Sequence, residues 1–250
     1  MQEILRKWDK WGTLRGREWK WVFSNLDLKK GKILDVGCLR ETYTATVNDL
    51  DKYLLEMGYE IYGLDVGECE FKHPNFTFIH KSIQELDSPD NYFDAVISVS
   101  TIEHIGLPFY VPIHGTKIEP DGDLRAVEQM KRVLKKGRHI LITGPYGIPK
   151  ETEHFRIYGQ SRLKKLVKGL KVIKAEFFVK KEILSGKDKL VNLPIPKIES
   201  ILSRLDGMES FVITSLLHQE RIKHISQPEA ERVSSPYFPR AIFCLKLLKT

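Results

Sequence analysis

Short apolar runs that end in glycine or polar residues recur along the chain. The first is Ile33, Leu34, Asp35 and Val36, which stops at Gly37. A nearly continuous apolar run is typical of a parallel strand that is buried on both faces. A strand that feeds a helix through a glycine turn opens many α/β sheets, and their ligands bind outside the carboxyl ends of the strands.

Later apolar runs repeat this pattern. Further strands are predicted over residues 60–65, 75–80, 92–98, 139–143, 172–179 and 240–248. Helices are predicted over residues 42–57, 121–134 and 160–167, and Gly58 ends the first of them. The alternation of strands and helices predicts an α/β fold in a single domain that spans residues 1–250.

Two parts of the chain lie outside this alternation. Residues 1–30 hold all four tryptophans, and Trp8 and Trp11 lie three apart, as on one face of an amphipathic helix. We expect this N-terminal helical cap to pack on the sheet, and the alternative is that it roofs a substrate pocket. Residues 181–239 carry no clear periodicity and are interpreted as an insertion or C-terminal elaboration.

The composition of the chain limits which binding partners and which cellular compartment are expected. The net charge is +7, but the lysine-rich part of the chain, residues 164–181, is typical of a solvated surface, and no nucleic-acid motif accompanies it. A nucleic-acid partner is therefore not expected. No apolar run is long enough to span a bilayer and no signal-peptide pattern is present, so a cytoplasmic location is expected. The three cysteines are odd in number and far apart, which fits a reducing compartment.

Acidic residues stand at the ends of the first two strands. Asp35 is costly to bury unless backbone N–H groups or a ligand satisfy it, which suggests an ordered turn beside a ligand. Asp65 follows the second apolar run, where doubly wound nucleoside-binding folds place the acid that binds ribose hydroxyls. The alternative for Asp65 is an aspartate that caps a turn.

A second group of polar residues follows the fourth predicted strand. Possible metal ligands gather there: Glu103, His104, His114, Glu119, Asp121 and Asp123. Carboxylates suit Mg²⁺ or Mn²⁺. Asp121 and Asp123 stand where a helix begins, however, and N-capping explains them without a metal. No metal site is predicted.

The order of these motifs resembles the class I S-adenosylmethionine-dependent methyltransferases over about residues 30–147. The matching segments are residues 33–37, 62–65, 93–98, 102–104 and 130–137. The resemblance implies a doubly wound, mostly parallel seven-stranded sheet with helices on both faces, and S-adenosylmethionine as cofactor. Residues 103–107 and 120–123 also look like a methyltransferase-like group associated with sugar-modifying enzymes. That likeness implies a small-molecule acceptor, with a saccharide hydroxyl as the best candidate.

The resemblance also implies a set of cofactor-binding residues. They are Asp35, Gly37, Arg40, Asp65, Ser82, Ile83 and Ser98. Asp65 would hold the ribose, Ser82 and Ile83 would flank the adenine, and Ser98 would lie near the methionine moiety. The Gly37 backbone would contact that moiety, and Arg40 would reach its carboxylate.

The first turn departs from the pattern of the family. Two or three glycines are usual there, whereas Cys38, Leu39, Arg40 and Glu41 follow Gly37 in this chain. A wider turn would still admit the cofactor. A closed pocket would instead give a non-catalytic domain that binds a nucleoside ligand or a protein partner. Nicotinamide-dependent oxidoreduction is a distant third hypothesis, because the phosphate-binding glycines are absent.

The chemistry implied is in-line displacement at an activated methyl group, for which the protein supplies alignment and, where needed, a base. His104, next to Glu103, is the candidate base, and its alternative is a histidine that packs at the strand end. Arg156 and Tyr158, in a loop predicted over the carboxyl edge of the sheet, are the candidate substrate contacts.

Overall fold

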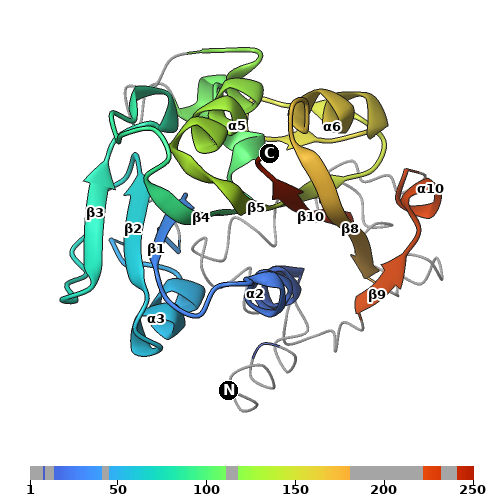
Figure 1. The fold of residues 1–250 in the computed structure, drawn as a ribbon. Coiled ribbons are helices and arrows are strands. Elements are labelled where there is room, and N and C mark those ends of the chain that lie inside the picture. The colour runs from blue at the N-terminus through green and yellow to red at the C-terminus, as the bar shows by residue number, and fades with distance from the viewer. Residues whose placement is uncertain (1–7, 9–13, 41–44, 111–117, 181–221, 232–240) are drawn as a thin grey trace, which may run out of the picture.

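The computed structural model describes residues 8, 14–40, 45–110, 118–180, 222–231 and 241–250. Their central element is an eight-stranded sheet with the order β3-β2-β1-β4-β5-β10-β8-β9 (Figure 1). Its strands are β1 (Lys32–Val36), β2 (Glu60–Asp65), β3 (Phe76–His80), β4 (Phe93–Val99), β5 (Leu134–Tyr146), β8 (Lys171–Lys180), β9 (Ile222–Ile225) and β10 (Ala241–Leu248). A separate hairpin pairs β6 (Lys150–Glu151) with β7 (Arg156–Ile157).

The sheet is mostly parallel. Strands β1 to β5 run in one direction, whereas β10 is antiparallel to both β5 and β8. The predicted fold class is confirmed, but the predicted count of seven strands is wrong, because β9 adds an antiparallel edge strand beside β8. The apolar residues of β9, Ile222 and Ile225, lie three apart, which hides it from a search for the period of two that marks a strand.

Helices cover both faces of the sheet. Helices α2 (Leu14–Asn25) and α3 (Asp49–Glu56) lie on one face, and α5 (Gly122–Val133) and α6 (Gln160–Leu166) lie on the other (Figure 1). The short helix α10 (Gln227–Ala230) lies near β8. No helix of the described ranges is long and apolar enough to cross a membrane.

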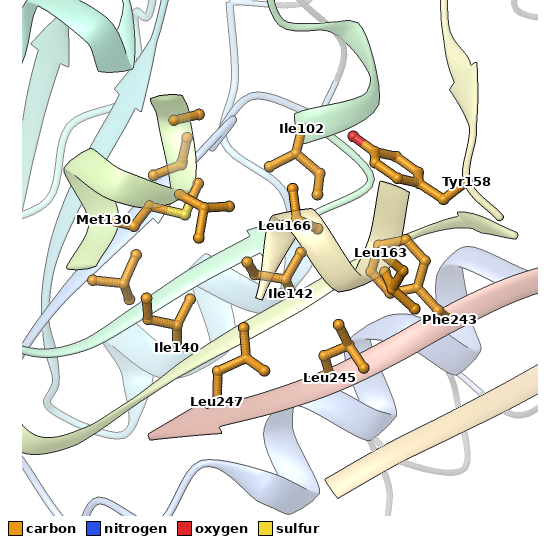
Figure 2. Packing of buried hydrophobic residues seen from close by; sticks show 14 of the residues in the cluster. Ile102, Met130, Ile140, Ile142, Tyr158, Leu163, Leu166, Phe243, Leu245 and Leu247 are labelled. Atoms are coloured by element: carbon orange, nitrogen blue, oxygen red, sulfur yellow. The ribbon is translucent and has the colours of Figure 1, made fainter. Parts of the chain in front are cut away.

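Each face of the sheet carries one apolar cluster, and successive side chains along a strand belong to alternate clusters. Ile140 and Ile142 of β5 belong to the cluster under α5 and α6, together with Met130, whereas Leu141 belongs to the cluster under α2 and α3 (Figure 2). Each side chain buried in this way stabilises the fold by about 1.5–3 kcal/mol. Burial on both faces explains why the parallel strands read as continuous apolar runs.

The helix predicted over residues 42–57 begins later than expected. Asn48 is the N-cap of α3, and its Oδ1 accepts a hydrogen bond of 2.9 Å from the backbone N–H of Asp51. Val47, which the helical spacing included, instead forms an isolated antiparallel bridge with Leu39. A predicted start at Thr42 is therefore wrong, since Val47 belongs to the turn; residues 41–44 lie outside the described part.

The tryptophans of the N-terminal region pack as expected. Trp8 is 1% exposed, and its ring centroid lies 6.1 Å from that of Trp19 and 5.8 Å from that of Tyr53 in α3. Trp11 lies outside the described residues. Packing on the sheet is confirmed for Trp8 and for the buried Trp21 of α2, while Trp19 also takes part in the site.

Candidate functional site

A cavity of about 630 Å³ lies at the carboxyl ends of β1, β2 and β4. Six residues singled out from the sequence are among those lining it: Gly37, Arg40, Asp65, Ser82, Ile83 and His104. The cavity has the size of a cofactor or small-molecule site. Parallel strands of neighbouring position end at this edge, which is why residues distant in sequence meet there.

Gly37 forms the turn after β1 in a conformation that suits glycine. Its φ is +85°, and a Cβ atom at this position would lie 2.0 Å from Oγ1 of Thr101. Its backbone N–H donates a 2.8 Å hydrogen bond to the carbonyl of Leu64 in β2. The glycine is therefore required by close contact between the first turn and the segment after β4.

The side chain of Cys38 leaves the cavity open. Cys38 is fully buried, and its Sγ would lie 2.7 Å from a Cβ atom added to Gly63 of β2. The missing side chain of Gly63 thus makes room for the thiol, whose pKa is raised by burial. Leu39, the next residue, does line the cavity. The unusual turn therefore does not close the pocket.

Asp65 stands in the cavity wall at the end of β2. Its Oδ2 accepts a 3.2 Å hydrogen bond from the backbone N–H of Leu39, and its Oδ1 accepts one of 3.1 Å from the backbone N–H of Gly67. These bonds tie the acid to the first turn. A carboxylate has about four acceptor positions, so it can bind backbone and ligand hydroxyls together.

Asp35 does not line the cavity but supports the turn from below. It is 1% exposed and accepts a 2.8 Å hydrogen bond from Nδ2 of Asn48, which also donates to the carbonyl of Cys38. Burial raises the pKa of Asp35 to about 6, and it raises that of the adjacent, fully buried Asp51 well above the usual range. The negative charge of Asp35 adds to this upward shift in the pKa of Asp51.

Of the residues predicted to lie near the adenine and the methionine moiety, two line the cavity and one does not. Ser82 and Ile83, at the start of the 3-10 turn η1 (Ile83–Glu85), line the cavity. Ser82 makes no cap hydrogen bond, because its hydroxyl donates to Oε1 of Gln84. Ser98 is fully buried and donates to the carbonyl of Val36 at 3.2 Å, so it lies behind the cavity wall.

His104 lines the cavity from the 3-10 turn η2 (Ile102–His104). Its Nδ1 lies 2.6 Å from the carbonyl oxygen of His154. A carbonyl only accepts, so Nδ1 carries the proton and Nε2 has the lone pair of a neutral ring. Burial, with a smaller contribution from Arg15, lowers the pKa of His104 to about 4.

Glu103 is near His104 but does not line the cavity. It is 2% exposed, and its Oε1 lies 3.8 Å from Nε2 of His104. Burial raises the pKa of Glu103 to about 8, which keeps the carboxyl group protonated at neutral pH. Of the predicted catalytic pair, only His104 can touch a ligand in the cavity.

Arg156 and Tyr158 do not line the cavity, contrary to their predicted role as substrate contacts. Arg156 is 1% exposed and donates to the carbonyls of Ile105, at 2.6 Å, and Pro120, at 3.2 Å. Tyr158 is fully buried and donates to Oδ2 of Asp123 at 2.9 Å. Buried backbone carbonyls that lie outside helices and strands need such donors. These side chains therefore hold the segment that forms the cavity rim.

Asp121 and Asp123 also differ from their predicted capping role. Asp121 occupies the N-cap position of α5 but makes no cap hydrogen bond. Asp123 is fully buried, and its Oδ1 forms a 2.5 Å ion pair with Nη2 of Arg162. No group of three or more His, Cys, Asp or Glu in the described ranges could hold a metal ion, and His114 lies outside those ranges.

Helix α2 contributes to the cavity, which agrees with the alternative that the N-terminal cap roofs a pocket; Arg15 is the residue that the sequence did not single out. Arg15 and Trp19 line the cavity, together with Glu119 and Arg125 from the rim. Arg15 and Glu18 lie three apart, which places them on one side of a helix and is the signal that was available. Glu18 is 2% exposed and accepts a 2.6 Å hydrogen bond from the hydroxyl of Thr143, so it fastens α2 to the end of β5.

One protein family matches part of the sequence. Residues 75–184 match the model of a family described as Caenorhabditis protein of unknown function, DUF268. This match covers less than half of the chain. No curated protein matches the sequence.

Solved structures match across nearly the whole chain. 1,6-Didemethyltoxoflavin-N1-methyltransferase from Burkholderia thailandensis, solved with S-adenosylhomocysteine, matches with a TM-score of 0.55 and 12% identity, over 94% of this chain and 78% of that one. A methyltransferase from Archaeoglobus fulgidus matches with a TM-score of 0.54 and 17% identity, over 94% and 92%. The [4+2]-cyclase SpnF matches with a TM-score of 0.52 and 16% identity, over 93% and 80%.

The cyclase indicates that this architecture also occurs in proteins named for other chemistry, so the activity must be argued from the site. The structures named as methyltransferases match this chain over nearly its whole length. The chain therefore has the fold of the class I S-adenosylmethionine-dependent methyltransferases.

Proposed function

We propose that the protein transfers a methyl group from S-adenosylmethionine to a small-molecule acceptor. The observation that carries this proposal is one cavity that is lined by Gly37 and Asp65 and also by His104. Both a cofactor and an acceptor must occupy neighbouring parts of one site for in-line transfer. The volume of about 630 Å³ is within the range of such sites.

The chemistry of the lining residues fits the cofactor. The carboxylate of Asp65 would accept hydrogen bonds from the ribose hydroxyls, Ile83 offers an apolar surface for the adenine, and the bare backbone of Gly37 allows the methionine moiety to approach. Asp35 supports this turn through Asn48 rather than by direct contact. When bound, S-adenosylmethionine supplies a methyl group on an already activated sulfonium.

The acceptor would bind at the end of the cavity formed by His104. A hydroxyl group can donate to the unprotonated Nε2, which the bond from Nδ1 to His154 directs. The attacking hydroxyl becomes strongly acidic as its oxygen gains the methyl group and the bond from that methyl to sulfur breaks, so even a weakly basic imidazole can take the proton. A saccharide hydroxyl remains the acceptor that we propose, on the basis of the sequence likeness of residues 103–107 and 120–123.

Calorimetry tests the cofactor half of the proposal. Wild-type protein should bind S-adenosylmethionine, and Asp65→Ala should weaken binding by about 1.5–3 kcal/mol through loss of a charged acceptor. Glu85→Ala is a control that should bind the cofactor like wild type. Glu85 also lines the cavity, but it comes after Ser82 and Ile83, the predicted adenine contacts. Equal binding by wild type and Asp65→Ala would refute the assignment.

Methyl transfer from labelled cofactor to a panel of sugars, amines and hydroxy acids tests the acceptor half. Transfer to a sugar hydroxyl supports the full proposal. Transfer only to another class keeps the enzyme activity and rejects the saccharide. Cofactor binding without transfer to any acceptor would favour the non-catalytic alternative, a domain that holds a nucleoside ligand.

A further inference from the structure

Helix α2 brings a guanidinium group into the cavity wall. The side chain of Arg15 is 38% exposed and lines the cavity, and its Nη1 donates a 2.7 Å hydrogen bond to the carbonyl of Val99. This bond uses one of the five donors of the guanidinium. The remaining donors form the planar fork that suits a carboxylate.

The position of Val99 places Arg15 beside the first turn. β1 and β4 are parallel neighbours in which Asp35 is paired with Ile97. Two residues further along each strand, Gly37 is therefore level with Val99. Thr101 closes the same corner, since its Oγ1 would lie 2.0 Å from a Cβ atom on Gly37. Arg15 is thus on the β4 side of the turn glycine.

Arg40, the cation suggested by the sequence, is on the other side of the turn. Leu39, its neighbour, donates its backbone N–H to Asp65 at 3.2 Å. The backbone of Arg40 then continues away from β1 by bonding to the carbonyl of Thr46. Arg40 is therefore next to the acid that would hold the ribose, whereas the methionine moiety must extend beyond the ribose toward Gly37 and His104.

The surroundings of Arg15 hold its charge in place before a ligand arrives. Glu18, one turn later, lies with Oε2 3.8 Å from Nε of Arg15. Glu18 is itself fixed by hydrogen bonds from Thr143 and from Ser100, a cavity-lining residue with a φ of +46°. A pre-positioned guanidinium loses little side-chain entropy when it binds an anion.

We propose that Arg15, and not Arg40, binds the carboxylate of the methionine moiety of the cofactor. The inference rests on the proposed cofactor site and adds to it a residue outside the segment that resembles the methyltransferases. It makes α2 part of the binding site rather than a cover for the sheet. Cofactor binding would then depend on the contact of α2 with β4 and β5.

Two ligands that differ in the amino-acid part separate this role from general binding. S-Adenosylhomocysteine carries the carboxylate, whereas 5′-methylthioadenosine keeps the adenine, ribose and sulfur but lacks it. Calorimetry should show that Arg15→Gln weakens S-adenosylhomocysteine by about 10- to 100-fold, the loss of one charge-assisted hydrogen bond, and leaves 5′-methylthioadenosine within threefold of wild type. Arg15→Lys keeps the charge without the fork and should give an intermediate loss.

The matched control is Arg17→Gln on the same helix. The guanidinium of Arg17 lies over the ring of Phe178, 5.4 Å from its centroid, and Arg17 is not among the residues lining the cavity. It should bind both ligands like wild type. Retained binding of 5′-methylthioadenosine by Arg15→Gln also shows that this variant is folded.

Three results would overturn the inference. They are wild-type affinity of Arg15→Gln for S-adenosylhomocysteine, an equal loss of both ligands in that variant, and a selective loss in Arg40→Gln instead. If wild-type protein bound neither ligand, the cofactor proposal would fail and this inference with it. That outcome is distinct from the other three, which all require a functioning adenosine site.

Discussion

Asp51 and Asp35 are two buried carboxyl groups that lie next to each other beneath the first turn, and each is 1% exposed or less. Asn48 donates a hydrogen bond of 2.8 Å to Asp35. Burial and the charge of Asp35 raise the pKa of Asp51, so we expect the two acids to share one proton at neutral pH. This pair supports the turn that we assign to the cofactor.

Replacing Asp51 tests the shared proton. Asp51→Asn keeps a donor toward Asp35 and should lie within about 1 kcal/mol of wild type at pH 7, whereas Asp51→Ala leaves Asp35 short of a donor and should cost about 1–3 kcal/mol. The pKa of Asp51 is raised above 3.8. The stability that its proton contributes is therefore complete at low pH and is lost as pH rises toward the folded-state pKa.

Urea unfolding over a pH series measures this effect. Stability of Asp51→Asn should decline less at high pH than that of wild type. If the Asn and Ala variants are equally destabilised at pH 7, no proton is shared between the two acids.

Glu103 should give a second pH dependence. Its pKa is raised from 4.5 to about 8 by burial. The protonated carboxyl group stabilises the fold fully below pH 4.5, and this contribution is lost by up to about 1.4 kcal/mol per pH unit as pH rises from 4.5 to 8. Glu103→Gln, which is neutral throughout, should flatten the profile between pH 4.5 and pH 8. A profile parallel to that of wild type would mean that Glu103 is ionised in the folded protein.

His104 should act as a neutral base throughout the physiological range. Its pKa is lowered to about 4, so turnover with an identified acceptor should not fall through protonation of this imidazole between pH 8 and pH 5. His104→Ala should lower turnover by about 10²–10⁴-fold, the usual contribution of a positioned base, and leave cofactor affinity nearly unchanged. A variant within threefold of wild type would remove His104 from the mechanism, and a variant that loses cofactor binding would assign it to the cofactor end.

Gly37 and Gly58 have nearly the same φ, so replacing each by alanine separates the cost of backbone strain from the cost of steric overlap. Gly37 has a φ of +85° and Gly58 a φ of +84°, but a Cβ atom on Gly58 would have no atom within 4 Å. Gly58→Ala should cost about 1 kcal/mol from the backbone alone. Gly37→Ala should cost at least about 1–3 kcal/mol more because it overlaps Thr101. Urea unfolding provides the comparison. Equal costs would show that the turn can move away from Thr101, and Thr101→Gly should recover part of the difference if it cannot.

The buried guanidinium of Arg156 should be hard to replace. Arg156→Met leaves the carbonyls of Ile105 and Pro120 without their donor and should cost about 2–4 kcal/mol, while Arg156→Lys should cost less. Arg138→Met, at an exposed position, should stay within about 0.5 kcal/mol of wild type. Hydrogen exchange at the amide of Glu119, which donates to Gly106 at 2.9 Å, should accelerate in Arg156→Met. Unchanged exchange there would show that the rim does not depend on this side chain.

The parallel strands could be predicted from the sequence because a strand that is buried on both faces is apolar at almost every position. β1, β2 and β4 were found in this way, and the acid at Asp65 was found because it ends such a run. β9 was missed because two isoleucines three residues apart do not show the period of a strand. Edge strands are short and half exposed, so their sequences constrain them weakly.

The cofactor end of the site was easier to predict than the acceptor end. Gly37, Asp65 and Ile83 follow strand ends directly, so topology alone brings them together. The sequence predicts Arg156 and Tyr158 as ligand contacts because polar residues beyond a strand end often serve that role. Their bonds to Ile105 and Asp123 depend on tertiary packing that no local pattern records.

Arg156 holds the cavity rim through hydrogen bonds to the main-chain carbonyls of Ile105 and Pro120. These two hydrogen bonds do not depend on which side chains the rim carries. Under the proposed function, substitutions of Glu119, which lines the cavity, should change the part of the site that the acceptor occupies while the first turn and Asp65 stay as they are. Glu119 is therefore the natural starting point for changing which acceptor this scaffold accommodates.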